Sequence, residues 1–228
     1  MPFARQIQPL LPEPRFKSLR ELHVEPLAKT TADGGRAGKG QSPGWVRLEC
    51  PPMTTIERCA WAQSHPILAE YHDNEYGYRR DSGAELFELL VLEIFQAGLS
   101  WLTILKKRDA FRAAFDRFDP AVVARYGDAE RTRLLADAGI VRNRLKIDAT
   151  IHNAQVVLDL IESHGSFSNW LDSKGTLDRK GWVAIFKKTF RFTGGEITNE
   201  FLLSSGYLSI DHEVTCFKFL VSDASLES

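Results

Sequence analysis

The sequence contains little cysteine, almost no net charge and no long apolar run. Its three cysteines are odd in number and far apart in a chain of 228 residues, which excludes a disulfide framework and favours a reducing compartment. A formal net charge of −1 gives the chain no general attraction for nucleic acid, so such binding would need a local basic face. No stretch approaches about 18 consecutive apolar residues, and the first residues do not include the apolar segment of a secretory signal. We therefore expect no membrane span, no secretory signal and a cytoplasmic location.

The composition that is present divides the chain into regions. Residues 1–53 are rich in proline and glycine, as in PLLPEPRF, TADGGRAGKGQSPG and CPPM, and show no sustained helical period. We expect them to form a poorly ordered extension. Residues 54–222 have the apolar content of a full core, within an overall hydrophobic fraction of 43%, and are expected to form one domain. Residues 223–228 are expected to be a short tail.

Apolar residues in the expected domain recur at helical spacing. Asp81 and Ser82 suit the start of the first long helix and Gly98 its end, while Pro120 suits a first turn and Asp128 a cap. Strand signals are weak throughout, so the predicted class is all-α. The predicted helices cover residues 82–97, 101–115, 118–127, 128–139, 143–165, 178–192 and 196–208.

The cysteines and histidines include a pattern typical of a metal site. Twelve residues separate Cys59 from His72, and three separate His212 from Cys216. Two thiolates and two imidazoles suit tetrahedral zinc, and four protein ligands leave no position for a catalytic water. The alternative is that both cysteines are small buried apolar residues and both histidines are incidental. A zinc ion here would join the two ends of the helical domain, whereas Cys50 is a spare thiol.

Glu93 falls on the apolar side of the predicted helix 82–97, between Leu86 and Leu89. A carboxylate in that position must be paired, protonated or functional; a hydrogen bond to a helix end and a catalytic role are both open. Trp101 lies just past the helix, and a carboxylate beside an aromatic ring suits a cationic base. The stripe of this helix that is expected to face water holds Glu85, Glu88 and Gln96.

The segment AEYHDNEYGY, residues 69–78, places Tyr71 and Tyr76 on either side of His72. Taken alone, it is typical of a polar surface loop, in which Asp73 or Asn74 caps a turn. Its polar residues therefore indicate no function by themselves.

Basic residues concentrate in the middle of the chain. Residues 101–147 hold eleven Lys or Arg against six Asp or Glu. Within this stretch, DAGIVRNRLK is typical of a helix end, a glycine turn and a new helix start that carries Arg142, Arg144 and Lys146. Backbone amides at such a start bind phosphate, with arginine side chains alongside. The alternative is a solvated charged face.

Five motifs occur in the order and spacing of one known family: ERCAWAQSHPILAEYHDNEYG, LEIFQAGLSWLTILKKR, LADAGIVRNRLKI, FRFTG and DHEVTC. Over residues 55–218 the chain resembles the 3-methyladenine DNA glycosylase I family, which belongs to the helix-hairpin-helix glycosylase superfamily. The resemblance implies an all-α fold and hydrolysis of the N-glycosidic bond of 3-methyladenine, an alkylated purine, in double-stranded DNA. It also implies a structural zinc ion bound by Cys59, His72, His212 and Cys216.

The resemblance further implies roles for single residues. Glu93 would be the catalytic residue that accepts hydrogen bonds from the flipped base, and the base would be bound by Tyr71, Trp101 and Tyr76. Leu99, unless it is a core leucine, would fill the space that the base leaves in the DNA stack. The residues expected to contact DNA phosphates are Arg142, Asn143, Arg144 and Lys146. We expect water to be the nucleophile, because residues 71–101 contain no lysine to form a Schiff base. We also expect the protein to be a monomer.

The chain departs from the family's usual pattern at several places. Tyr76 stands where tryptophan is usual, Ile94 and Phe95 follow the pocket glutamate where glycine is common, and Ile210 precedes Asp211 where asparagine is usual. A glycosylase with an altered substrate range is therefore one alternative. A non-catalytic, zinc-stabilised DNA-binding module is another, and a hydrolase whose zinc uses only three of the four ligands is the third.

Overall fold

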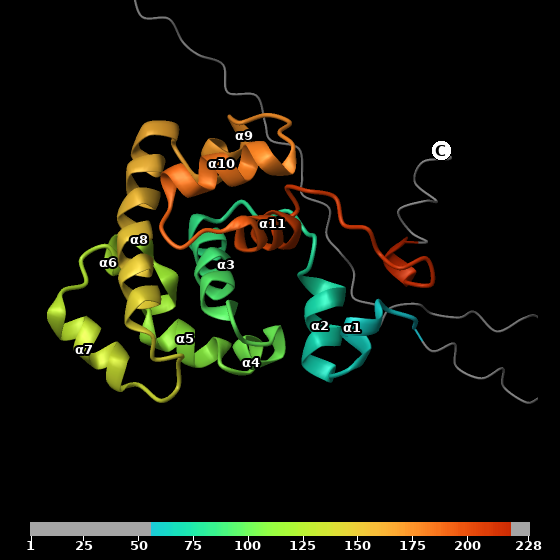
Figure 1. The fold of residues 1–228 in the computed structure, drawn as a ribbon, viewed down its shortest axis with the longest axis horizontal. Coiled ribbons are helices and arrows are strands. Elements are labelled where there is room, and N and C mark those ends of the chain that lie inside the picture. Colours follow the sequence, from blue (N-terminus) through green and yellow to red (C-terminus); the bar gives the residue numbers. More distant parts are fainter. Residues whose placement is uncertain (1–55, 220–228) are drawn as a thin grey trace, which may run out of the picture. The chain divides into compact units, whose positions relative to one another are not determined.

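The computed structural model describes residues 56–219, and every regular element among them is helical (Figure 1). This confirms the predicted all-α class. The predicted extension 1–53, the tail 223–228 and Cys50 lie outside the described residues. Within 56–219 we find no helix with the length and apolarity that crossing a membrane requires. The elements are α1 (Ala60–Gln63), α2 (Pro66–Asn74), α3 (Gly83–Gln96), α4 (Trp101–Lys106), α5 (Arg108–Ala114), the 3-10 helix η2 (Asp116–Phe118), α6 (Pro120–Val123), α7 (Asp128–Ala136), α8 (Arg144–His164), α9 (Phe167–Asp172), α10 (Arg179–Thr189) and α11 (Gly195–Ser204).

Side-chain caps begin several helices at their predicted positions. Ser82 begins α3 by accepting a hydrogen bond from the backbone N–H of Glu85, and Asn143 begins α8 in the same way. Asp119 caps α6, where Pro120 occupies the first turn as predicted. Each cap satisfies a backbone N–H that has no partner inside the helix, a contribution of about 1 kcal/mol.

Several of the predicted helices differ from the structure in their bounds. The predicted helix 101–115 is two helices, α4 and α5, because the chain bends at Lys107. Asp128 does not cap α7. Gly127 occupies that position, and its backbone N–H donates to the Glu130 carboxylate at 2.7 Å.

The segment 69–78 is not the polar surface loop that its composition predicts. Most of it belongs to α2, which begins at a side-chain cap from His65. Tyr71 is 4% exposed and His72 is completely buried. Helix α9, which contributes Trp170 to the core, was not predicted either.

Helix α3 runs through the middle of the described domain, with α4, α8, α9 and α11 packed around it (Figure 1). All residues of α3 from Leu86 to Phe95 are buried. Removing one large apolar side chain from water contributes about 1.5–3 kcal/mol, so this helix is a firm support for the residues that it carries. Tilted or stacked rings extend the core from α3 into α5 and η2 through Phe95, Phe111, Phe115 and Phe118.

Glu88 is buried in α3, contrary to the prediction that it faces water. Its carboxylate accepts hydrogen bonds from the guanidinium groups of Arg108 and Arg112, both from α5. Arg108 also donates to Glu75 at 2.7 Å, just beyond the end of α2. This network of charges, well matched in sign, ties α2, α3 and α5 together in a place where helical periodicity predicts only solvent.

Candidate active site and metal centre

A cavity of about 290 Å³ lies where α1, α2, α3, α4 and α11 approach one another. Ligand pockets commonly measure about 300–1,000 Å³, so this cavity suits one small, flat ring system. Four of its lining residues are aromatic and two are carboxylic acids. The lining comprises Trp61, Tyr71, Tyr76, Glu93, Gln96, Trp101, Glu200 and Ser204.

The aromatic rings hold one another at fixed angles around the cavity. The ring centroids of Tyr71 and Trp101 lie 5.3 Å apart at an interplanar angle of 61°. Tyr76 lies 5.9 Å from Tyr71 and 5.3 Å from Trp61. The structure therefore brings the three predicted base-binding residues together, and their negative ring faces favour a positively charged ligand.

Glu93 is buried at this cavity, as its helical position predicts. Glu93 is 3% exposed, and one of its carboxylate oxygens accepts a hydrogen bond from the Ser204 hydroxyl at 3.3 Å. The pKa of Glu93 is raised to about 8, chiefly by burial and then by the negative charge of Glu200, and only the Ser204 hydrogen bond opposes the shift. The carboxyl group thus favours its neutral form at pH 7 unless a positive charge lies beside it.

Two buried polar atoms in the cavity wall have no hydrogen-bond partner among the described residues. They are the Tyr71 hydroxyl and the Trp101 indole Nε1. Burial raises the pKa of Tyr71, so its hydroxyl stays protonated and able to donate. A buried polar group without a partner costs about 1–3 kcal/mol, and a ligand that carries acceptor atoms would remove that cost.

Four lining residues were not predicted from the sequence: Trp61, Gln96, Glu200 and Ser204. Trp61 falls within the first family motif, whereas Glu200 and Ser204 come from α11. The last two are one helical turn apart, so their shared face was visible in the sequence. Which cavity that face meets depends on how α11 packs against α3, and no local pattern gives this.

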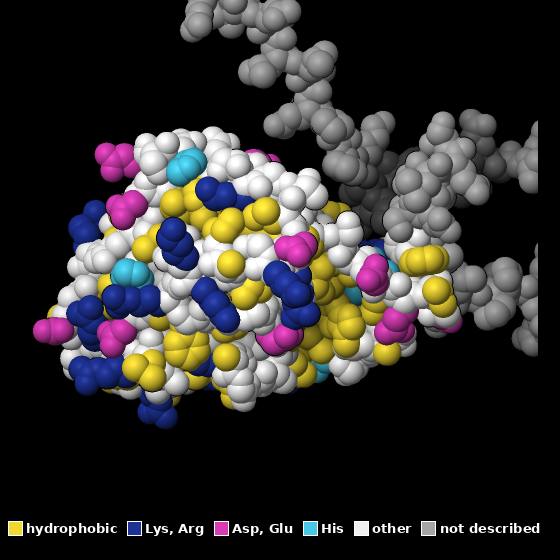
Figure 2. Space-filling model, turned by 45° about the horizontal axis from the view of Figure 1, so that its top comes forward, with side chains coloured by type: hydrophobic (Ala, Val, Ile, Leu, Met, Phe, Trp, Pro, Cys, Tyr) yellow, Lys and Arg dark blue, Asp and Glu magenta, His cyan; other side chains and the backbone are white. Residues whose placement is uncertain are grey.

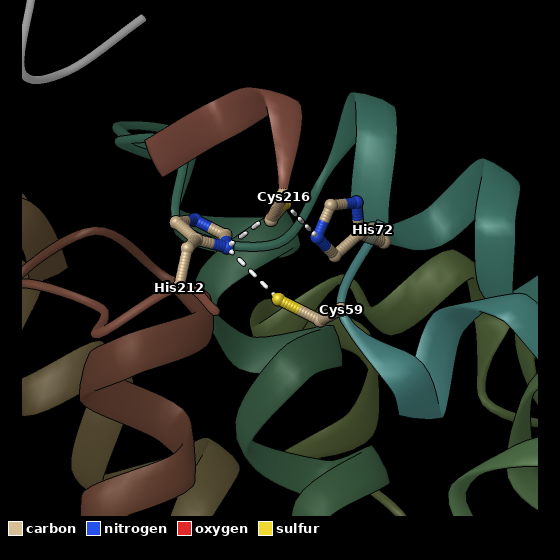
Figure 3. Close-up of side chains that lie close together, drawn as sticks. All are labelled: Cys59, His72, His212 and Cys216. Atoms are coloured by element: carbon tan, nitrogen blue, oxygen red, sulfur yellow. Dashed lines mark hydrogen bonds between the residues drawn. The ribbon is translucent and has the colours of Figure 1, made fainter. Parts of the chain in front are cut away.

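The four predicted metal ligands converge at one place (Figure 3). Their ligand atoms all lie within 4.8 Å of one another. The Cys59 sulfur is 3.4 Å from Nδ1 of His212, and the Cys216 sulfur is 3.5 Å from Nε2 of His72 and 3.9 Å from Nδ1 of His212. Sulfur and nitrogen ligands on a tetrahedral zinc ion would be about 3.5 Å apart, so these residues fit that metal.

The neighbours of His72 also fit a metal ligand. Its Nδ1 lies 2.9 Å from a carboxylate oxygen of Asp73, and Asp73 in turn accepts hydrogen bonds from the Arg58 guanidinium. An Nδ1–H donated to a carboxylate leaves Nε2 free to bind a metal ion, a common arrangement around zinc. Tyr71 and His72 are adjacent in α2, so one helix supplies both a cavity wall and a metal-site ligand.

The loop between α3 and α4 lies at one side of the cavity. Leu99 in this loop is 42% exposed, which excludes the alternative that it is a core leucine. Lys146 at the start of α8 donates hydrogen bonds to the carbonyl oxygens of Phe95 and Ala97, and is 5% exposed. This inward placement does not fit the predicted phosphate contact of Lys146, because the ammonium group holds the end of α3 instead.

The turn between α7 and α8 presents the remaining predicted DNA contacts. Arg142 and Arg144 are exposed, whereas the Asn143 side chain caps α8. Lys and Arg side chains gather at the end of the molecule that carries α7 (Figure 2). Lys107 fastens the turn to α5 by donating to the carbonyl oxygens of Ala138 and Gly139.

The comparisons with known proteins agree with one another. The family model described as methyladenine glycosylase matches residues 61–181. DNA-3-methyladenine glycosylase 1 of Escherichia coli is 36% identical over 181 residues, which cover 71% of this chain and 96% of the relative. A DNA-3-methyladenine glycosylase of Haemophilus influenzae is 38% identical over 119 residues, covering 52% of this chain and 63% of the relative.

Two solved structures extend the likeness to the fold. A crystal structure of 3-methyladenine DNA glycosylase I has a TM-score of 0.65 at 35% identity, over 71% of this chain and 98% of that one. The 3-methyladenine DNA glycosylase I of Staphylococcus aureus, solved for the structural basis of its 3-methyladenine recognition, has a TM-score of 0.60 at 32% identity. That match covers 66% of this chain and 90% of the other. The helical arrangement described above is therefore the fold of these enzymes.

Proposed function

The chain belongs to the methyladenine glycosylase family, and we propose that it excises 3-methyladenine from double-stranded DNA by hydrolysing the N-glycosidic bond, with the flipped base in the aromatic cavity. The observation that carries this proposal is Glu93, a buried carboxylate without a cationic partner among residues 56–219, at an aromatic wall with two unpaired donors. Such a cavity favours a flat, positively charged ligand. A nucleotide must leave the duplex to reach it.

The substrate supplies the missing charge. Methylation at N3 makes adenine cationic, and breaking the bond to the sugar returns its electron pair to the base, which leaves neutral. Water adds to C1′ of the sugar and releases one proton to the solvent. The leaving base thus needs no acid, and the protein must chiefly recognise a cation and hold it away from the duplex.

Glu93 and the base favour each other's charged forms. A positive charge beside a carboxyl group opposes the effect of burial and lowers its pKa. Glu93 is therefore proposed to ionise as the base enters and to accept hydrogen bonds from it. Tyr71 and Trp101 offer ring faces and donors at the same wall, and Tyr76 packs against Tyr71. Neutral adenine would leave the carboxyl group without a counter-charge.

The DNA-binding surface is proposed to run from the Leu99 loop to the turn between α7 and α8. This turn is proposed to be the helix-hairpin-helix element, with Arg142 and Arg144 on phosphates and Asn143 ordering the start of α8. Leu99 is proposed to fill the space that the flipped nucleotide vacates, which its exposure permits. Lys146 is left out of the phosphate contacts and assigned to holding the end of α3.

A structural zinc ion is proposed at Cys59, His72, His212 and Cys216. The support is the chemistry of the donor set, the spacing of the four ligand atoms, and the carboxylate behind His72. All four ligands come from the protein, which disfavours the alternative of a hydrolytic zinc with a bound water. The ion would hold α2, and with it Tyr71, in place. We further propose that the protein acts as a monomer.

The activity is tested by incubating the full chain with methylated duplex DNA and resolving the free bases by chromatography. We expect release of 3-methyladenine, and no covalent enzyme–DNA adduct after borohydride treatment, because residues 71–101 contain no lysine. Glu93→Gln should reduce excision by about 100-fold or more while leaving general DNA affinity unchanged.

Two outcomes contradict parts of this proposal. A borohydride-trapped adduct would mean that an enzyme amine attacks the sugar. Protein that binds zinc and DNA but releases no base would favour the non-catalytic module. Release of other alkylated bases alongside 3-methyladenine would instead show the wider substrate range that Tyr76, Ile94 and Phe95 left open.

A further inference from the structure

A second carboxylic acid, Glu200, lines the cavity from α11, across from Glu93 on α3. Its only hydrogen-bond contact within residues 56–219 is the neighbouring Asn199 side chain, whose Nδ2 lies 3.4 Å from a carboxylate oxygen. None of the ion pairs formed by the described residues includes Glu200. This acid therefore faces the cavity without a counter-charge.

The other partly buried acids near this site are treated differently by the fold. Glu75 pairs with Arg80 and Arg108, and Glu88 pairs with Arg108 and Arg112. Carboxylates are stabilised away from water when an arginine forks onto them. The fold thus supplies arginines to Glu75 and Glu88, and supplies none to the two acids of the cavity.

The charge of Glu200 acts on the cavity wall. After burial, it is the largest cause that raises the pKa of Glu93 and of Tyr76. Two acids alone would not indicate a ligand, but the Tyr71 hydroxyl and the Trp101 Nε1 are buried in the same wall without a partner. A ligand with a positive charge and polar ring atoms would give both carboxylic acids a counter-charge and both unpaired donors a hydrogen-bond partner.

We propose that Glu200 is a specificity-determining residue of the base pocket, and that its carboxylate, together with Glu93, selects positively charged alkylated purines over neutral purines. This inference rests on the proposed function of the cavity. The carboxylate of Glu200 contributes negative charge to the cavity, while Glu93 accepts hydrogen bonds from the base. An amino group on the purine ring is a suitable donor to Glu200, since hydrogen bonds to an ionised acceptor are stronger than neutral ones.

The test separates charge recognition from catalysis by using free ligands. Trp61 and Trp101 line the cavity, so ligand binding to the full chain is measured by the change in tryptophan fluorescence. The probes are 3,9-dimethyladeninium, a permanent cation, and 9-methyladenine, an uncharged analogue. Glu200→Gln should weaken binding of the cation by about tenfold or more, and binding of the neutral analogue by less than about twofold.

Glu196→Gln is the matched control. Glu196 lies one turn before Glu200 on α11, but its carboxylate is exposed and pairs with Arg179 at 2.7 Å. We expect this variant to bind both probes as the wild type does. Glu200→Asp, which keeps the charge, should retain most of the preference for the cation. Circular dichroism of each variant identifies any that fails to fold, and Glu200→Ala, which also removes the charge, then replaces Glu200→Gln with the same expected loss of cation binding.

The excision assay completes the design. For methylated duplex DNA, Glu200→Gln should raise KM by about tenfold and lower kcat less, because the lost interaction is made with the bound base. If Glu200→Gln binds each probe with the same affinity as the wild type, the proposed role of Glu200 is overturned, even if the wild type excises 3-methyladenine. A wild type that prefers the cation but excises nothing would instead contradict the proposed activity and leave the role of Glu200 standing.

Discussion

Glu88 and Glu93 lie on the same helix, and both are buried, yet their surroundings differ in kind. Glu88 is neutralised by Arg108 and Arg112, whereas Glu93 receives one hydrogen bond from Ser204. A buried carboxylate with matched arginines holds helices together. A buried carboxylate whose only partner is a hydroxyl is unfavourable in its charged form, and a cationic ligand beside it can stabilise that form.

The unusual state of Glu93 makes stability depend on pH. Its pKa in the folded protein is about 8, above the ordinary value of 4.5. The stabilisation that folding gains from keeping Glu93 protonated is therefore fully present below pH 4.5, and it is lost as the pH rises toward 8. We expect Glu93→Gln to remove this dependence. Its free energy of urea unfolding, relative to wild type, should increase between pH 5 and pH 8 by a few kcal/mol, on the order of 3.

Measuring both proteins at each pH cancels the titration of every other group. Glu85→Gln is a suitable control, because Glu85 precedes the buried part of the same helix. A constant difference between wild type and Glu93→Gln across this pH range would mean that Glu93 titrates normally in the folded protein.

At the level of helices, capping residues made much of the fold predictable. Ser82, Asn143 and Pro120 mark helix starts that the structure confirms. Helix α2 was missed because its sequence, PILAEYHDN, mixes polar and apolar residues without a clear stripe. Two of its three buried side chains, Tyr71 and His72, face an aromatic wall and a Cys/His cluster that are built largely by distant segments. The local sequence therefore contains no sign of what it packs against.

The aromatic cavity was predictable only in part for a similar reason. Helical position placed Glu93 on the buried face, and the family motifs selected Tyr71 and Trp101. Glu200 could not be recognised, because its significance arises only when α11 crosses α3. Lys146 was assigned to phosphate because of its neighbours Arg142 and Arg144. Its side chain turns inward, where the carbonyl oxygens at the end of α3 accept hydrogen bonds from its ammonium group.

Charge reversal at Arg142 and Arg144 tests the turn between α7 and α8 as the phosphate-binding element. Both side chains are exposed, so changing each to glutamate should leave the core intact. We expect duplex affinity to fall by about tenfold or more at low salt, equally for all sequences, and the slope of log affinity against log salt to decrease by about 2. Unchanged affinity at low salt would mean that the basic surplus is only a solvated face.

Lys146 connects this turn to the loop of Leu99. Its ammonium group donates to Phe95 and Ala97 at 3.0 and 2.7 Å, so α8 holds the backbone that precedes Gly98. Lys146→Met keeps the length of the side chain but leaves two carbonyl groups without these donors, at a cost of about 1–3 kcal/mol in unfolding free energy. We expect excision from duplex DNA to fall more than binding of a free base, because the loop, not the cavity, loses its support.

Lys106→Met provides the comparison, since Lys106 is an exposed lysine on α4. Excision and free-base binding that fall by the same factor in Lys146→Met would place the damage in the cavity. Equal stability of the two variants in urea would show that the hydrogen bonds to α3 contribute nothing measurable.

At the scale of the whole domain, the Cys/His cluster joins the beginning of the described chain to its end. Cys59 immediately precedes α1 and His72 lies in α2, while His212 and Cys216 follow α11. The backbone supports the same junction, because the N–H of Phe217 donates to the carbonyl oxygen of Glu57 at 2.9 Å. Linking segments so far apart removes much conformational freedom from the unfolded chain.

This junction also supports the aromatic cavity, because α2 carries both His72 and Tyr71. We expect Cys216→Ala to lose stoichiometric zinc and to lower Tm by about 10 °C or more, because metal binding is coupled to folding. Since His72 and Tyr71 are adjacent in α2, the same variant should bind 3,9-dimethyladeninium more weakly at a temperature where it remains folded. Elemental analysis, calorimetry and tryptophan fluorescence measure the three effects. Cys50→Ala should keep the metal, because Cys50 is not among the four ligands. Stoichiometric zinc retained by Cys216→Ala would remove the proposed site, and loss of zinc with unchanged base binding would separate the metal from the pocket.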